Sequence, residues 1–296
     1  MPARFNGFVP DHAALTRLLE DDRSYRIGRA GDCDLVIDHA SISRSHAELQ
    51  RGPDGWQLRD CGSKNGVRVD GERVATASFG NKAWFAVGDV YCSLETLDAA
   101  AAARQRENDT RRRATSLQLS ARLAHAPAIG ALLPQALDAV LELSGLERGF
   151  VLYADVGAPL RVRARRGLNA SELAGAAFDG SAAAVERALG SRQCVVCCDT
   201  DESPWLGLRP SVRLGGIRAI VCVPLLAEAA ALGLIYADSR RPGPAITELD
   251  LELIRNAADQ AATALAAHRL NDAIAGLLEQ ATAAGIEAPR WDELRA

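Results

Sequence analysis

The chain has 296 residues, a formal net charge of -4 and a hydrophobic content of 48%, enough for two domains that each bury a core. The acidic balance argues against a nucleic-acid-binding surface that covers the whole molecule. The N-terminus lacks the pattern of a signal peptide, and the apolar run at residues 217–226 is interrupted by Arg218 and Pro224. We therefore expect a cytoplasmic protein without nucleic-acid or membrane partners.

Three polar clusters lie between residues 27 and 66, separated by runs in which apolar and polar residues alternate. The clusters are Ile27 to Arg29, Ser43 to His46 and Gly62 to Gly66. Alternation of this kind is typical of β-strands, so the clusters are expected in the loops between strands. The N-terminal part of the chain is predicted to be an all-β sandwich that presents these loops.

The side chains in the clusters suit a phosphate group. Arg29 offers a rigid fork of donors, which fits a phosphate better than a flexible ammonium does. Ser43 adds a hydroxyl donor, while Arg44 and Lys64 add positive charge. Asn65 carries a donor and an acceptor, which suits it to hold the backbone of an extended peptide. No nucleophile with a base accompanies these groups, so the sequence predicts binding and not an enzyme.

These clusters belong to a longer pattern that resembles the signature of a forkhead-associated (FHA) domain. The matching segments are residues 25–29 (YRIGR), 43–49 (SRSHAEL) and 60–71 (DCGSKNGVRVDG). The resemblance implies a β-sandwich over residues 1–97 that binds phosphothreonine peptides. It implies that Arg29 and Ser43 contact the phosphate, with Arg44 and Lys64 nearby. It also implies that Asn65 holds the backbone of the peptide.

Three further residues of the pattern are given structural roles. Gly28 and Gly66 permit backbone geometry that larger residues resist, and His46 is expected to be a buried brace between the loops. The sequence departs from the family at Val67, where Thr is frequent. Residues 10–24 are also less strand-like than the opening hairpin of the family.

Residues 98–125 are rich in Ala and Arg and contain neither Gly nor Pro up to residue 125, which predicts a helical linker. The basic run Arg111 to Arg113 has two interpretations. It could contact nucleic acid or an acidic partner, or it could be a solvated helix face, and the solvated face is favoured.

The chain beyond residue 126 has a different pattern. It predicts a helix at 129–144, strands at 149–153 and 160–165, a helix at 182–189, and strands at 193–197, 218–224 and 232–237, a succession typical of an α+β domain. Residues 185–189 (VERAL), 222–225 (CVPL), 233–239 (GLIYADS) and 247–250 (TELD) resemble a GAF domain over residues 126–270. The layout is similar to the front end of some bacterial FHA–GAF signalling and transcription regulators.

GAF domains bind various small molecules, and the ligand is not given by the fold. The residues that bind cyclic nucleotides in the family have no equivalent set after residue 126, and no Cys lies in a bilin-attachment motif, so no cofactor is predicted. Cys194 and Cys197 have a C-x-x-C spacing that could indicate zinc or redox chemistry. In a strand, however, residues three apart point to opposite faces, so buried small residues are favoured and no metal is predicted.

The last helix is predicted to begin with a capping box formed by Thr247 and Asp250. An apolar stripe follows from Leu251 to Leu265 in steps of three and four, and it continues toward Leu278 within a helical tail at residues 271–296. The stripe could pack on its own sheet or form a seam with a second copy. A homodimer with parallel helices is the favoured interpretation.

Together these features predict a multidomain adaptor that docks a threonine-phosphorylated protein, such as a Ser/Thr kinase or its substrate, and dimerises or senses through the second domain. The alternative is a small-molecule sensor whose first domain is a constitutive, phosphate-independent interaction surface. No P-loop or helix-turn-helix follows the second domain up to Ala296. The output of a chain that ends there is expected to pass through a partner.

Overall fold

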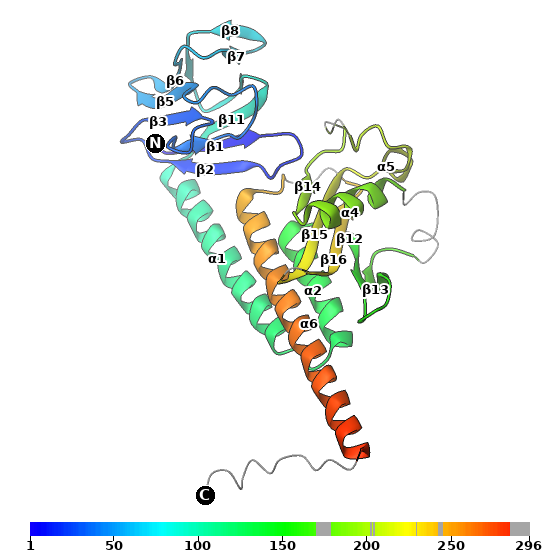
Figure 1. The fold of residues 1–296 in the computed structure, drawn as a ribbon. Helices are drawn as coiled ribbons and strands as arrows, with labels where there is room; N and C mark the ends of the chain where they lie inside the picture. Colours follow the sequence, from blue (N-terminus) through cyan, green and yellow to red (C-terminus); the bar gives the residue numbers. More distant parts are fainter. Residues whose placement is uncertain (170–178, 202, 204, 229, 242–244, 285–296) are drawn as a thin grey trace, which may run out of the picture.

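The computed structural model describes the whole chain except residues 170–178, 202, 204, 229, 242–244 and 285–296. Residues 3–96 form a sandwich of two β-sheets, a long helix follows, and a second domain is built around one antiparallel sheet (Figure 1). The predicted fold class, an all-β sandwich joined by a helical linker to an α+β domain, is confirmed.

The sandwich buries its core between a six-stranded and a five-stranded sheet. The first contains, in spatial order, β2 (Leu15–Leu19), β1 (Ala3–Phe8), β11 (Val90–Thr96), β10 (Lys82–Val87), β7 (Val67–Val69) and β8 (Glu72–Val74). The second contains β4 (Leu35–Val36), β3 (Tyr25–Gly28), β5 (Ala47–Gly52), β6 (Gly55–Asp60) and β9 (Thr76–Phe79). The opening hairpin forms although its sequence signal is weak, because Ala3 and Phe5 point into the core and pair with Leu19 and Arg17.

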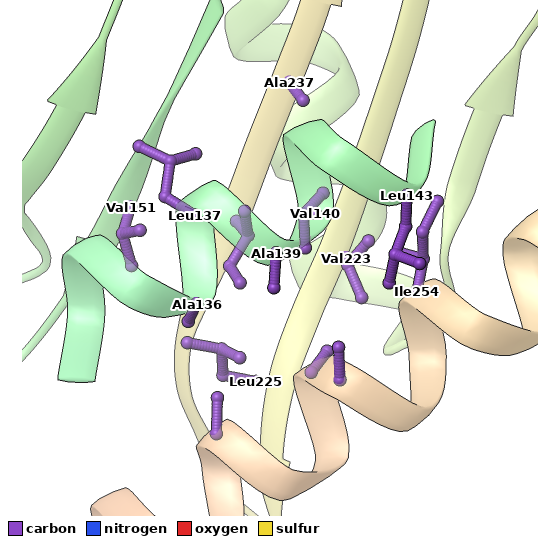
Figure 2. Close-up of a cluster of buried hydrophobic side chains, with 14 of the residues drawn as sticks. Ala136, Leu137, Ala139, Val140, Leu143, Val151, Val223, Leu225, Ala237 and Ile254 are labelled. Atoms are coloured by element: carbon purple, nitrogen blue, oxygen red, sulfur yellow. The ribbon is translucent and has the colours of Figure 1, made fainter. Parts of the chain in front are cut away.

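The second domain packs helices on both faces of a five-stranded antiparallel sheet. Its strands, in spatial order, are β13 (Arg161–Arg166), β12 (Arg148–Tyr153), β16 (Ala230–Ser239), β15 (Ala219–Ala227) and β14 (Val195–Cys197). One face is covered by α2 (Ile129–Ser144) and α6 (Glu248–Ala283), with α1 (Ala99–Ala124) beside them, and the other by α4 (Asp179–Ser191) and α5 (Pro210–Gly215). Figure 2 shows Val140 and Leu143 of α2 facing Val223 of β15 and Ile254 of α6 in this core.

Local signals in the sequence set the helix ends. The helix predicted at residues 129–144 is α2, with the same bounds. At the start of α6, the backbone N–H of Asp250 donates to Thr247 Oγ1 (3.2 Å) and the N–H of Thr247 donates to Asp250 Oδ2 (2.9 Å), so the predicted capping box is confirmed. The helix then continues without interruption past residue 270 to Ala283. No helix in the described part of the chain is long and apolar enough to cross a membrane.

The turn between β1 and β2 joins the sandwich to the second domain. The N–H of Ala14 donates to the carbonyl of Ile246 (2.8 Å), and the N–H of Glu248 donates to the carbonyl of Ala14 (3.0 Å). In the same turn, Asp11 Oδ2 accepts a hydrogen bond from Trp205 Nε1 at 3.0 Å. Because these bonds satisfy backbone groups on both sides, the two domains have a defined relative position.

The basic residues 111–113 of α1 form hydrogen bonds and ion pairs with other residues of the same chain. Arg112 is half-buried, donates to the carbonyl of Leu143 at 2.9 Å and forms an ion pair with Asp250. Arg113 lies 3.5 Å from Glu252 on α6, and Arg111 forms an exposed ion pair with Glu107 (3.3 Å) one turn earlier. Arg111 and Arg113 thus occupy an exposed helix face as favoured from the sequence, whereas the solvated-face interpretation is wrong for Arg112, which ties α1 to α2 and α6.

A buried ion pair crosses the sheet of the second domain. Arg148 of β12 lies opposite Asp238 of β16 and donates from Nε to Asp238 Oδ1, with both side chains almost fully buried. Burial raises the pKa of the Asp238 carboxyl, and the guanidinium of Arg148 acts in the opposite direction. The charge of Asp238 therefore depends on Arg148 for its compensation.

Replacing Arg148 with Met should lower the free energy of unfolding by about 3–5 kcal/mol, because a buried carboxylate loses its charged partner. The pKa of Asp238 should rise further in the folded variant. The folded state then binds a proton before the unfolded state does as the pH falls, so the deficit should shrink toward acidic pH. Urea unfolding of R148M and the wild-type protein at several pH values measures this difference. In the control R148M/D238L, with no buried charge at either position, the deficit should be smaller and should not depend on pH through this pair.

Candidate functional site

Three loops of the sandwich meet at one residue, Ser43. Its carbonyl accepts a hydrogen bond from the N–H of Arg29 (2.9 Å), and its hydroxyl oxygen accepts one from the N–H of Lys64 (3.1 Å). Its own N–H donates to His46 Nδ1 at 3.0 Å. Since Oγ acts as an acceptor in the loop network, the hydroxyl hydrogen is available to donate to a bound acceptor.

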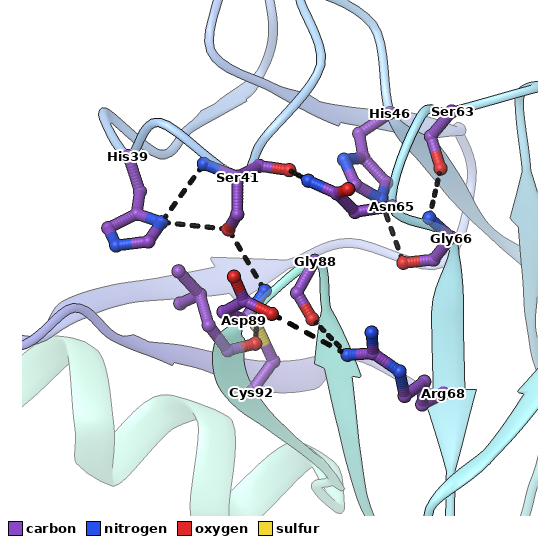
Figure 3. Close-up of polar contacts among 11 residues, drawn as sticks. His39, Ser41, His46, Ser63, Asn65, Gly66, Arg68, Gly88, Asp89 and Cys92 are labelled. Atoms are coloured by element: carbon purple, nitrogen blue, oxygen red, sulfur yellow. Dashed lines mark hydrogen bonds and ion pairs between the residues drawn. The ribbon is translucent and has the colours of Figure 1, made fainter.

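His46 connects two of these loops from inside the protein. Its side chain is fully buried. Because Nδ1 accepts from the N–H of Ser43, the ring hydrogen lies on Nε2, which donates to the carbonyl of Gly66 at 3.0 Å (Figure 3). The neutral imidazole satisfies one buried donor and one buried acceptor, and it fixes the distance between the Ser43 and Gly66 loops.

Two glycines allow the loops to come this close. A Cβ atom on Gly28 would lie 2.2 Å from the carbonyl oxygen of Arg44, so any other residue would push the two loops apart. Gly66 has a φ of +75°, and a Cβ there would lie 2.3 Å from Nε of Arg73. Gly28 therefore requires glycine for steric reasons, because it meets backbone, whereas at Gly66 the positive φ is the requirement, because the Arg73 side chain could move away.

The side chains of Arg29, Arg44 and Lys64 are exposed, and none of them forms an ion pair with any residue that the structure describes. The neighbouring Arg26 and Arg68 differ, since they lie 3.4 and 3.7 Å from Asp32 and Asp89 respectively. Three cationic side chains without an ion-pair partner in the described chain thus lie on the residues around Ser43. Such an arrangement attracts a compact anion with several acceptor oxygens.

Asn65 lies beside this cationic group and is half-buried. Its Nδ2 donates to the carbonyl of Ser41 at 2.8 Å (Figure 3), which anchors the side chain. The amide oxygen and the second N–H have no protein partner in the described chain. An anchored amide with one free donor and one free acceptor can pair with the backbone of an extended peptide.

Sequence reasoning missed two serines and one aspartate at this end of the sandwich. Ser63 Oγ accepts from the N–H of Gly66 (2.9 Å) and shapes the turn before Asn65. Ser41 Oγ accepts from the N–H of Asp89 (2.9 Å), which ties the β10–β11 turn to the same loops. Serines that bond nearby backbone groups are typical of turns, but the partner of Ser41 is remote in sequence and only the fold shows it.

The sheet of the second domain is covered by apolar side chains under helices α4 and α5. The rings of Phe150 and Tyr236 stack there with centroids 4.8 Å apart. Cys194 and Cys197 contact opposite faces of the sheet, as predicted for a strand. Burial raises the pKa of Cys197 to about 12, so this side chain is a neutral thiol at neutral pH.

Comparisons with known proteins match the two domains separately. The model of the FHA domain family matches residues 25–90, and that of the GAF domain family matches residues 129–265. The chain carries an FHA domain followed by a GAF domain. The first match contains all the loop residues described above, whereas the second contains the five-stranded sheet with its helices, up to the middle of α6.

Two curated relatives match short parts of the chain. The ABC transporter ATP-binding/permease protein Rv1747 of Mycobacterium tuberculosis is 41% identical over 76 residues, which are 26% of this chain and 8% of that protein. The glycogen accumulation regulator GarA of Mycolicibacterium smegmatis is 36% identical over 66 residues, which are 22% of this chain and 42% of that protein. The chain thus covers less than half the length of either relative.

Two solved structures each match a part of the chain. The FHA domain of CT664 from Chlamydia trachomatis has a TM-score of 0.31 and 24% identity, and it covers 33% of this chain and 100% of that chain. A methyl-accepting chemotaxis protein, residues 122 to 287, has a TM-score of 0.39 and 20% identity, and it covers 53% of this chain and 99% of that chain.

Replacing His46 with Ala should lower the free energy of unfolding of the FHA domain by about 2–4 kcal/mol, since a buried N–H and a buried carbonyl lose their partners and a cavity forms. Chemical unfolding followed by tryptophan fluorescence and circular dichroism measures the loss. The control His125→Ala removes an exposed ring and should change stability by less than about 0.5 kcal/mol. Equal stability of H46A and H125A would contradict the bracing role.

Proposed function

We propose that this protein is a signalling adaptor that binds a threonine-phosphorylated partner through the FHA domain, with the GAF domain in a sensory or dimerisation role. The observation that carries the proposal is the group of three unpaired cations around the free hydroxyl hydrogen of Ser43. A phosphorylated side chain brings nearly two negative charges and three acceptor oxygens. The site supplies what such a group needs, and binding rather than catalysis is its proposed role.

Each residue of the site has a proposed part. Arg29 and Ser43 contact the phosphate directly, and Arg44 and Lys64 contribute charge close to it. Asn65 holds the peptide backbone next to the phosphothreonine. Gly28, His46 and Gly66 keep the loops in position, as their packing and hydrogen bonds support.

We propose residues 1–97 as the FHA domain, 98–125 as a linker, 126–270 as the GAF domain and 271–296 as a helical tail. The start of the tail does not coincide with a helix end, since α6 passes through it. The phosphate would come from a Ser/Thr kinase, with that kinase or one of its substrates as the partner, and we propose that the adaptor acts in the cytoplasm. The intrachain bonds of Arg111, Arg112 and Arg113 support a protein partner rather than nucleic acid.

The end of α6 supports a homodimer. Leu270, Ile274, Leu277 and Leu278 are spaced along one side of the helix beyond the GAF core, and Leu277 and Leu278 are 65% and 52% exposed. An apolar row at this spacing is what a second, parallel copy of the helix would cover. No other described element packs on this row, so we propose that the partner is a second copy of the chain.

The phosphate site is tested with matched peptides that contain phosphothreonine or threonine. Binding to the full chain, measured by calorimetry, should require the phosphate and should weaken about ten- to a hundred-fold in Arg29→Ala, because charge-assisted hydrogen bonds are lost. Arg104→Ala is the matched control, since Arg104 is an exposed arginine on α1. Equal affinity for both peptides would overturn the proposal. Thermal stabilisation by a small molecule together with that result would favour a sensor with a constitutive FHA surface.

The dimer is tested by replacing Leu277 with Glu, which should separate the subunits because a charge on each copy would lie in the apolar seam. Light scattering over a range of concentrations should give twice the 31.4 kDa chain mass for the wild-type protein and the single mass for L277E. Leu208→Glu is the control, because Leu208 is 79% exposed and lies far from α6 in sequence. A wild-type protein that stays monomeric at high concentration would rule out the dimer.

A further inference from the structure

A cleft of about 700 Å³ lies between the FHA and GAF domains. The FHA domain contributes the β1–β2 turn and the outer face of the sheet at β10 and β11, and the GAF domain contributes Cys198, Asp199 and Ala245. The bonds from Ala14 to the start of α6 hold its two sides together. The cleft is therefore a property of the two-domain chain and not of either domain alone.

Aromatic rings form the FHA side of the cleft. Phe8 of β1 and Trp84 of β10 stack with ring centroids 5.6 Å apart, and Tyr91 of β11 pairs with Phe8 in the sheet register. Trp84 is 53% and Tyr91 is 65% exposed, which is unusual for rings of this size. Exposed ring faces of Trp and Tyr attract cations as well as apolar groups.

The carboxylates are the permanently charged groups of the described lining, and His12 is its other titratable side chain. Asp11, Asp89 and Asp199 contribute carboxylates, whereas no Lys or Arg side chain is among the described lining residues. Asp89 and Asp199 have arginine neighbours outside the lining, Arg68 at 3.7 Å and Arg218 at 2.9 Å. Asp11 accepts from Trp205 through Oδ2, but its Oδ1 is buried without a hydrogen-bond partner in the described chain. A buried carboxylate oxygen without a donor favours a ligand that supplies one.

Hydrogen bonds connect the lining of the cleft to the phosphate site. Asp89, which lines the cleft, donates its N–H to Ser41 Oγ, and the carbonyl of Ser41 accepts from Asn65 (Figure 3). An extended peptide advances about 3.3 Å per residue. Because Asp89 bonds the same serine that anchors Asn65, the cleft would receive side chains of the peptide that lie near its phosphothreonine.

We propose that this cleft binds an arginine or lysine side chain of the same phosphorylated partner. The proposal rests on the proposed function and extends it, because it adds a positively charged residue to the recognised peptide and gives the GAF domain a share in recognition through Asp199. The aromatic faces hold the methylene stem and the cation, and the carboxylates accept its hydrogen bonds. The loops around Ser43 would bind the negatively charged phosphothreonine of the peptide, and the cleft would bind its positively charged Arg or Lys side chain.

The test uses phosphothreonine peptides in which one flanking position at a time is Arg, Ala or Glu. At one or two positions on one side of the phosphothreonine, Arg should bind the full chain about three- to ten-fold more tightly than Ala, and Glu should bind more weakly than Ala. Trp84→Leu, which removes the π face, and Asp199→Asn, which removes the GAF carboxylate, should each reduce this preference at least two-fold. Both variants should keep the dependence on phosphate.

Asp54→Asn is the matched control, because Asp54 is an exposed carboxylate in the β5–β6 turn and does not line the cleft. Circular dichroism verifies the fold of each variant, and D199N carries the test if W84L does not fold. The cleft proposal would be overturned, and the proposed function kept, if binding depends on phosphate but shows no preference for Arg. The same holds if D199N and D54N show the same preference for Arg. Loss of self-association in W84L would assign the cleft to a second copy and also overturn it. Binding without phosphate dependence would instead overturn the proposed function.

Discussion

The first turn of α6 is the point on which the arrangement of the molecule depends. Thr247 and Asp250 cap the helix, Asp250 also pairs with Arg112 of the linker, and the backbone on either side of Thr247 bonds to Ala14 of the FHA domain. Three parts of the chain are thus fastened within one helical turn. Asp250 is almost fully buried, so its charge needs both sets of partners. The shape of the cleft between the domains follows from this junction.

The candidate phosphate site has a different origin, because it depends on how closely three loops approach. Gly28 removes the side chain that would separate two of them, and His46 joins the remaining pair through a buried ring. The cations themselves make no bonds that hold the loops. Shape and charge are therefore provided by different groups, since the backbone of Arg29, Arg44 and Lys64 helps to hold the loops while their exposed side chains stay unpaired.

The sequence predicted the features that depend on local chemistry. The helix at 129–144, the capping box and the three loop clusters each follow from residues a few positions apart. It did not predict contacts between remote segments, because spacing carries no information about them. Asp89 bonds Ser41 across 48 positions, and Arg112 reaches both α2 and α6. The residues of the β1–β2 hairpin also showed only a weak strand pattern. Its short strands are stabilised by pairing with β11 and by the core rather than by intrinsic strand propensity.

The length of α6 has a mechanical consequence. Its 36 residues form one helix that spans about 54 Å at 1.5 Å per residue. Its first turn touches the FHA domain, Leu253, Ala257 and Ala261 pack in the GAF core, and its last turns lie beyond that core. In a straight helix of this length, any tilt about the packed segment would displace the far end more than the start. The position of the apolar row from Leu270 to Leu278 would therefore depend on the angle at which α6 meets the FHA domain.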